Sequence, residues 1–158
     1  TRHFQLSAEA TYLEAYYRSY PNAGPTTLQQ AQGVGIQDLT GRPTSLAPRW
    51  SENVTASYEL PLGGGYRFTT EAIGFCSAQY FLSSGTDDPL LSQGDYCRLD
   101  ARLLLQAPNN RWDVAVIGRN LTDRAILDMG SALPTSAGSF IVNKEQPRNV
   151  AVQFDVRF

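Results

Sequence analysis

The nine C-terminal residues, Val150 to Phe158, alternate strictly between apolar and polar side chains. Successive residues of a strand point to opposite faces, so the apolar side chains share one face. These are Val150, Val152, Phe154, Val156 and Phe158, opposite Ala151, Gln153, Asp155 and Arg157. The apolar face reaches the final residue, where chain ends usually fray. The closing strand of an outer-membrane barrel needs such a face, because lipid lies outside and water inside.

Five further segments show the same alternation and are predicted to be strands. They run roughly from Phe4 to Tyr20, Trp50 to Leu60, Tyr66 to Phe81, Tyr96 to Gln106 and Arg111 to Leu121. β-branched and aromatic residues are abundant in them, and helical spacing fits none of them better. We therefore expect an all-β fold without helices. It is an antiparallel up-and-down meander of six long strands, the C-terminal part of a larger transmembrane β-barrel.

The connections between these strands alternate in length. Residues 21–49, 82–95 and 122–149 form long connections, whereas residues 61–65 and 107–110 form short ones. In an up-and-down sheet the long connections then lie on one side, which is typical of outer-membrane barrels. A soluble β-sandwich is the alternative. It explains the alternation but not the asymmetry of the connections.

Composition narrows the possible partners. The net charge is −2, the pI is about 5.3, and no basic run is present, so we expect no nucleic-acid partner. No stretch of 18 apolar residues occurs, so a transmembrane helix is not expected. A mean hydropathy of −0.30 does not argue against a membrane barrel, because barrel strands alternate.

No catalytic or metal-binding constellation is recognisable. His3 is the only histidine, which leaves no basis for a catalytic triad or a histidine metal site. Asp87, Asp88 and Asp95 could bind a hard cation, but we interpret them as water-exposed turn residues. The glycines at 63–65 lack a following helix and indicate a tight turn rather than a phosphate site. We expect no enzyme activity, no cofactor and no metal.

Aromatic residues form two groups near opposite strand ends. Tyr16, Tyr17, Tyr20, Tyr80 and Phe81 lie toward the long connections, and Tyr58, Tyr66 and Trp112 lie toward the short ones. Two such groups fit the aromatic girdles of the two membrane interfaces. Ordinary strand propensity is the alternative explanation.

Most charged residues of the predicted strands fall on the non-lipid parity. We expect the lumen-facing residues to be Glu59, Arg67, Glu71, Arg98, Asp100, Arg102 and Arg119. A lysine or arginine facing lipid at mid-membrane costs ~2–4 kcal/mol, which explains this placement. Glu14 breaks the parity, so the first strand is expected to carry a bulge or to end early.

Cys76 and Cys97 flank one long connection and share the apolar parity. Centring the hairpin on residues 82–95 places Cys76 opposite Ala101 and Cys97 opposite Tyr80. The cysteines are then ~13 Å apart along the strands, whereas a disulfide needs Cα atoms within ~7 Å. A small shift of the loop centre would close the gap. Two free thiols are the favoured prediction, and a disulfide is the alternative.

Several short motifs resemble one family. They are Asp38-Leu-Thr-Gly-Arg-Pro43 with Ala47-Pro-Arg-Trp50, Asp95-Tyr-Cys-Arg-Leu-Asp-Ala-Arg102, Trp112-Asp-Val-Ala-Val-Ile-Gly-Arg-Asn-Leu-Thr-Asp123, and Pro147-Arg148 with Phe158. In this order they are similar to the C-terminal part of TonB-dependent outer-membrane receptors. The resemblance covers about Tyr12 to Phe158.

The resemblance implies a larger protein of the bacterial outer membrane. Such receptors close about 22 strands around an N-terminal plug domain, so the plug and most strands are expected to be absent here. The implied function is to bind a scarce nutrient outside, of the siderophore, cobalamin or carbohydrate class, and to import it with energy supplied by TonB. A small structural or adhesive barrel is one alternative, but it needs about eight strands. A soluble β-sandwich binding module is another.

The resemblance also implies the partners. They are the lipid bilayer, a small-molecule ligand, the barrel-assembly machinery, and the TonB complex through the missing N-terminal part. We expect Val150, Val152, Phe154, Val156 and Phe158 to be the signal that the assembly machinery reads. No residue that contacts the ligand is identifiable from the sequence.

Overall fold

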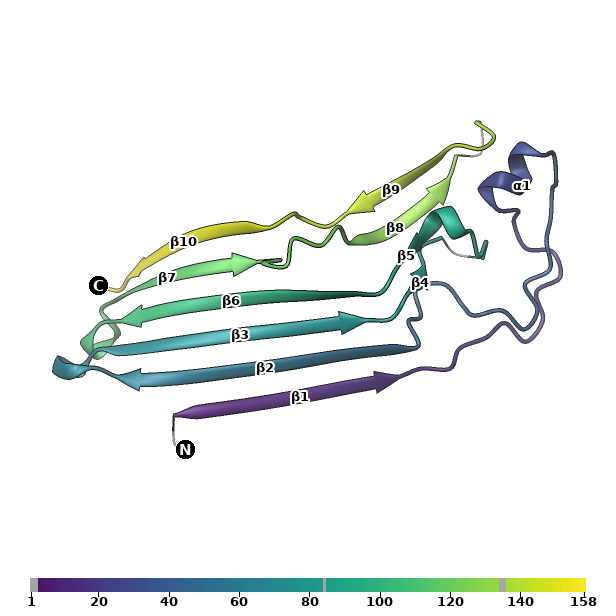
Figure 1. Ribbon diagram of the computed structural model, residues 1–158. Helices are drawn as coiled ribbons and strands as arrows, with labels where there is room; N and C mark the ends of the chain where they lie inside the picture. The colour runs from purple at the N-terminus through teal and green to yellow at the C-terminus, as the bar shows by residue number, and fades with distance from the viewer. Residues whose placement is uncertain (1–2, 84, 134–135) are drawn as a thin grey trace.

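The computed structural model describes residues 3–83, 85–133 and 136–158. Its main feature is one six-stranded antiparallel sheet in which the strands follow each other in chain order (Figure 1). The strands are β1 (Phe4–Tyr12), β2 (Trp50–Pro61), β3 (Arg67–Ser77), β6 (Tyr96–Gln106), β7 (Trp112–Arg119) and β10 (Asn149–Val156). The predicted all-β, up-and-down meander is therefore confirmed. The sheet is not closed, and β1 and β10 are its two edges.

The strand register gives the sheet one apolar and one polar face. One row of paired residues crosses all six strands on the apolar face: Phe4, Tyr58, Thr70, Leu103, Val116 and Val152. The adjacent row lies on the polar face: Gln5, Ser57, Glu71, Arg102, Ile117 and Ala151. The apolar face is open, and the side chains of Val152 and Phe154 are 71% and 63% exposed. A register slip of one residue would exchange the two faces.

Four of the predicted strands end earlier than expected. β1 ends at Tyr12 rather than Tyr20, and β3 and β7 end at Ser77 and Arg119. The terminal strand β10 ends at Val156, so Phe158, the last residue of the expected assembly signal, lies beyond it. Glu14 therefore lies beyond β1, and of the two explanations for its parity, the early end of the strand is correct. Glu14 pairs there with Arg49 at 2.9 Å and accepts a hydrogen bond from the Tyr12 hydroxyl.

The long connections contain short elements of their own. They are α1 (Thr27–Ala31), β4 (Tyr80–Phe81), η2 (Pro89–Leu91), β5 (Ser92–Gln93), β8 (Leu127–Ala132) and β9 (Phe140–Lys144). The expectation of a fold without helices was wrong, because Thr26 and Gln29 form a capping box that starts α1. No helix in the described part of the chain is long and apolar enough to cross a membrane.

The two short connections are tight turns at the other end of the sheet. Each contains a 3-10 turn, η1 (Gly63–Gly65) and η3 (Pro108–Asn110). The backbone at Gly64 and Asn109 has positive φ angles of 74° and 58°. Glycine adopts this conformation freely, and asparagine tolerates it better than most residues. The predicted tight turn at residues 63–65 is confirmed.

Most of the buried apolar side chains lie in the long connections rather than on the sheet. Ala23, Leu39, Leu82, Leu91 and Ile126 are each at most 1% exposed. We call residues 13–49, 78–95 and 120–148, as far as they are described, the loop cap. All three of its segments lie at one end of the sheet (Figure 1). The packed core of this chain is therefore in the loop cap, at the end opposite the short turns.

Candidate functional site

Four of the seven expected lumen-facing residues line one hollow on the polar face of the sheet. Glu71 of β3, Asp100 and Arg102 of β6, and Arg119 of β7 surround a space of about 450 Å³. Ile73, Ile117 and Gln153 complete its walls, and Ala101 and Gly118 also line it. We call this space the polar hollow. The alternation of β3, β6 and β7 brings these side chains together, because residues two apart on a strand share a face.

Arg98 lies in a neighbouring depression of about 300 Å³ that shares Asp100 and Arg119 with the polar hollow. Its guanidinium Nη1 pairs with Glu145 at 2.8 Å, and its Nε lies 3.5 Å from the Asp100 carboxylate. The other oxygen of Asp100 accepts a hydrogen bond from the backbone N–H of Asn120 at 2.8 Å. Arg98 and Asp100 are therefore already paired with each other and with other groups of this chain.

Glu59 and Arg67 lie on the polar face but not at the polar hollow. Glu59 borders a depression of about 200 Å³ with His3, and Arg67 donates to the Asn110 side chain at 2.8 Å. Both residues lie toward the short turns, because Pro61 and Arg67 pair at the end of the β2–β3 hairpin. The seven expected residues thus share a face without forming a single site.

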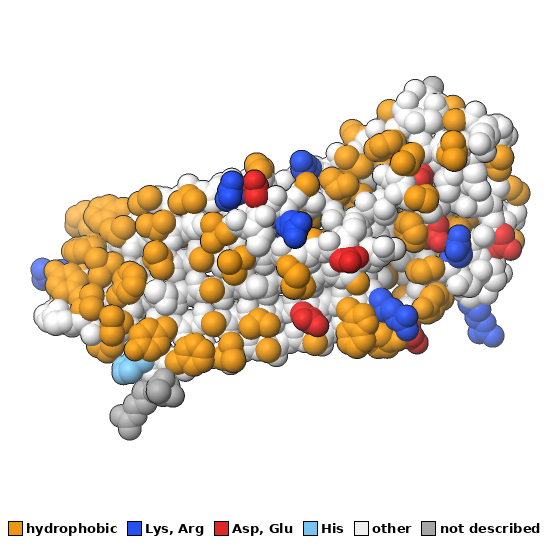
Figure 2. Space-filling model, viewed as in Figure 1, with side chains coloured by type: hydrophobic (Ala, Val, Ile, Leu, Met, Phe, Trp, Pro, Cys, Tyr) orange, Lys and Arg blue, Asp and Glu red, His pale blue; other side chains and the backbone are white. Residues whose placement is uncertain are grey.

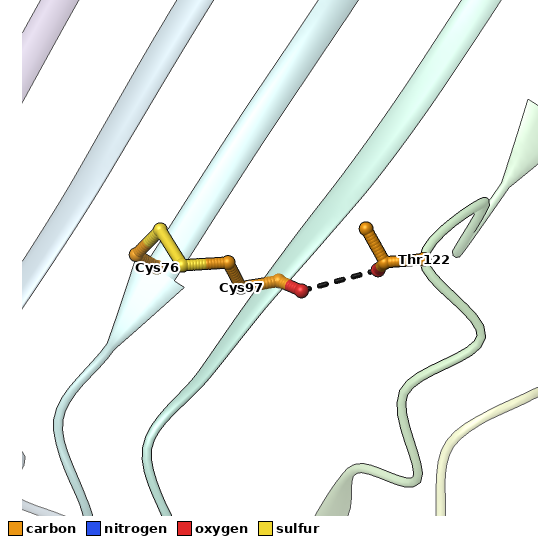
Figure 3. Close-up of a disulfide and its surroundings, with 3 residues drawn as sticks. All are labelled: Cys76, Cys97 and Thr122. Atoms are coloured by element: carbon orange, nitrogen blue, oxygen red, sulfur yellow. Dashed lines mark hydrogen bonds between the residues drawn. A yellow bond between two sulfur atoms is a disulfide. The ribbon is translucent and has the colours of Figure 1, made fainter.

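Cys76 and Cys97 form a disulfide on the apolar face (Figure 3). They oppose each other directly in the β3–β6 register, with Cα atoms 4.1 Å apart. The favoured prediction of two free thiols was therefore wrong. The same register continues through β4 and β5, where Tyr80 pairs with Gln93, so the hairpin is centred closer to the N-terminus than its loop boundaries suggested.

Asn120 explains how β7 leaves the sheet beside this disulfide. Its φ of 49° makes a kink, after which Leu121 N–H donates to the Leu99 carbonyl at 2.7 Å. The Asn120 side chain is buried and exchanges hydrogen bonds with the backbone N–H and C=O of Arg124, at 3.0 and 2.8 Å. The Thr122 hydroxyl then donates to the Cys97 carbonyl at 3.1 Å (Figure 3). Residues 120–123, the last four of the motif Trp112 to Asp123, thus form the exit from the strand.

The aromatic residues are arranged differently from the prediction at one end of the sheet. Tyr12 and Trp50 pair at the end next to the loop cap, with ring centroids 4.4 Å apart. Tyr66 and Trp112 pair near the short turns at 6.1 Å. The tyrosines at 16, 17 and 20 lie in the loop cap, because β1 ends before them. Figure 2 shows hydrophobic side chains gathered at the short-turn end, with acidic and basic side chains along the middle of the sheet.

Hydrogen bonds join the long connections into the loop cap. Asp88, only 1% exposed, accepts from both the backbone N–H and the hydroxyl of Thr27, and from Leu90 N–H at 3.0 Å. The Gln93 side chain accepts from Leu127 N–H at 2.6 Å. Asp88 and Gln93 therefore tie the middle connection to the first and the third. The sequence offered no signal for these contacts beyond the residue types.

Asp87 and Asp88 are buried, so their interpretation as water-exposed turn residues was wrong. The loop cap packs around them and leaves them 8% and 1% exposed. Burial raises the pKa of Asp87, and the charge of Arg42, 3.5 Å away, opposes that shift. No group of three metal-ligating side chains occurs among residues 3–83, 85–133 and 136–158.

Replacing Asp88 with alanine is expected to destabilise the loop cap by ~1–3 kcal/mol, because the two buried donors of Thr27 lose their acceptor, as does the Leu90 N–H. Hydrogen exchange of the amides at 26–31, 88, 90 and 91 should accelerate. Asp38→Ala is the matched control, since the exposed Asp38 accepts only within its own turn, from Thr40. Equal exchange in both variants would contradict the role given to Asp88.

Comparison with known proteins finds no match to this chain among protein-family models, curated proteins or solved structures. The resemblance to TonB-dependent receptors therefore stays a prediction from short motifs.

Proposed function

We propose that this chain forms the C-terminal part of the transmembrane barrel of a TonB-dependent outer-membrane receptor. The supporting observation is the apolar face, which continues in register across all six strands and lies opposite a polar face. In water, an open apolar face with two unpaired sheet edges favours aggregation. In a bilayer, the same face meets lipid while the polar face meets the aqueous interior.

Strand lengths and connections also support a membrane barrel. The six strands contain 8 to 12 residues, whereas a tilted membrane crossing needs ~9–11 and soluble strands average about five or six. The loop cap lies at one end and the short turns at the other, as in outer-membrane barrels. No second sheet of comparable size is present among the described residues to cover either face, as a β-sandwich would require.

The proposed role of the intact receptor is active import of a scarce nutrient. The loop cap faces the outside, and the polar face lines the path through the barrel. β1 and β10 are the edges at which the remaining strands join, since a barrel in lipid cannot leave an edge unpaired. The proposed classes of nutrient, which are siderophores, cobalamin and carbohydrates, are implied by the family resemblance alone.

The membrane location is tested with single cysteines at Val152 and at Gln153 in the full-length protein, with the Cys76–Cys97 disulfide intact. These neighbours lie on opposite faces of β10. Spin labels at 152 should collide with oxygen dissolved in the bilayer, and labels at 153 with a water-soluble nickel chelate. Equal accessibility at both positions would contradict the proposal. Uptake of each labelled nutrient class with and without TonB then tests transport.

Deleting Phe158 from the full-length protein is expected to lower its folded amount in the outer membrane several-fold. Phe158 ends the apolar alternation that we propose as the assembly signal, and it is fully exposed. Heat-modifiable gel mobility measures the folded fraction, and Phe158→Tyr is the conservative control. An unchanged folded fraction after the deletion would show that the assembly machinery does not read this residue.

A further inference from the structure

The polar hollow contains two arginines without an acidic partner in the described part of the chain. Arg102 on β6 and Arg119 on β7 are diagonal neighbours on the polar face, because Arg102 pairs with Ile117 in the ladder. None of the ion pairs among the described residues includes either arginine. Asp100, an acid that also lines the hollow, is already bound to Arg98 and to the Asn120 backbone.

Arg102 is further distinguished by its Nε atom, which is buried and has no hydrogen-bond partner. Leaving a buried donor unpaired is unfavourable, and more so when it belongs to a charged group. Glu71 stands opposite Arg102 in the β3–β6 register, but no ion pair joins the two side chains. The hollow thus holds two positive charges and one negative charge that form no ion pair with the residues the structure describes.

We propose that the polar hollow binds an oxyanion of a small solute, of the carboxylate or phosphate class. The planar guanidinium of Arg102 is suited to bidentate binding of such a group, with Arg119 as the second cation. Ile73 and Ile117 in its walls lower the local dielectric, which strengthens a charged hydrogen bond. A volume of about 450 Å³ lies within the range of small-molecule sites. The site is built from strands within this chain, so it does not depend on the proposed transport function.

The test uses the full-length protein in detergent at low salt, with radiolabelled citrate and inorganic phosphate as probes in equilibrium dialysis. Arg102→Gln and Arg119→Gln should each weaken binding about tenfold or more, and Glu71→Gln should strengthen it by removing the opposing charge. Arg102→Lys keeps the positive charge but lacks the planar guanidinium that can bind an oxyanion through two N–H groups, so this variant should bind the probes less tightly than wild type. Arg67→Gln is the matched control, because Arg67 shares the face but binds Asn110 outside the hollow.

The outcomes separate a free solute from an acidic side chain elsewhere in the full-length protein. Wild-type protein that binds neither probe, with Arg102→Gln lowering thermal stability, would mean that a protein carboxylate occupies the hollow and would overturn the proposal. Equal binding by wild type and both glutamine variants would also overturn it. Heat-modifiable gel mobility shows whether each variant is folded. If Arg102→Gln does not fold, the binding of Arg119→Gln decides the test. Binding by a protein that proves not to span a membrane would leave this inference intact and refute the proposed function.

Discussion

Replacing Val152 with arginine is expected to lower the free energy of unfolding of the full-length protein in lipid vesicles by ~2–4 kcal/mol. Val152 lies near the middle of β10 on the apolar face, where it pairs with Val116 and is 71% exposed. If that face meets the hydrocarbon of the bilayer, the guanidinium loses its hydration at the substituted position. In water the same substitution would cost little, because an exposed arginine remains solvated.

Gln153→Arg is the matched control for this substitution. Gln153 is the next residue on β10, lies on the polar face and borders the polar hollow. We expect a change below about 1 kcal/mol there, as for a typical surface substitution. Urea titration of vesicle-embedded protein, followed by tryptophan fluorescence, gives both values. Similar effects at 152 and 153 would mean that the two faces of β10 meet the same environment.

Period-two alternation was enough to predict the sheet. In β10 and β2 each apolar residue is followed by a polar one over most of the strand. A single strand orientation therefore places the apolar residues on one face of the sheet and the polar residues on the other. The faces then constrain the register, since only pairings that keep apolar residues together are favourable. The polar hollow follows partly from the same pattern, because the alternation alone predicts that Glu71, Arg102 and Arg119 share one face.

The loop cap could not be predicted in this way. Asp88 contacts Thr27, which is 61 residues away along the chain, and no periodic pattern encodes a contact between two irregular connections. The capping box at Thr26 was a local signal, since threonine followed three residues later by glutamine starts many helices. No apolar run follows it at residues 27–31, so this signal alone did not predict a helix. Asp87 and Asp88 were misinterpreted because aspartate in a loop usually faces water.

Removing the Cys76–Cys97 disulfide by the double substitution to serine is expected to destabilise the β3–β6 hairpin by ~3 kcal/mol. The cysteines are 21 residues apart in sequence, and closing a loop of that size in the unfolded chain accounts for a cost of this order. The effect should concentrate on the connection between the two strands, residues 78–95. Cleavage by an added protease within 78–95 should become faster, while the short turn at 63–65 stays resistant.

Reducing wild-type protein with a dithiol gives an independent measurement of the same quantity. Treated wild type and the double serine variant should show equal cleavage rates, and the dithiol should not change the variant. The β4–β5 pairing and the Asp88 contacts also hold this connection, so reduction should loosen it without unfolding the sheet. If reduction leaves the cleavage rate unchanged, these contacts alone fix the hairpin, and the disulfide adds nothing to the order of the loop cap.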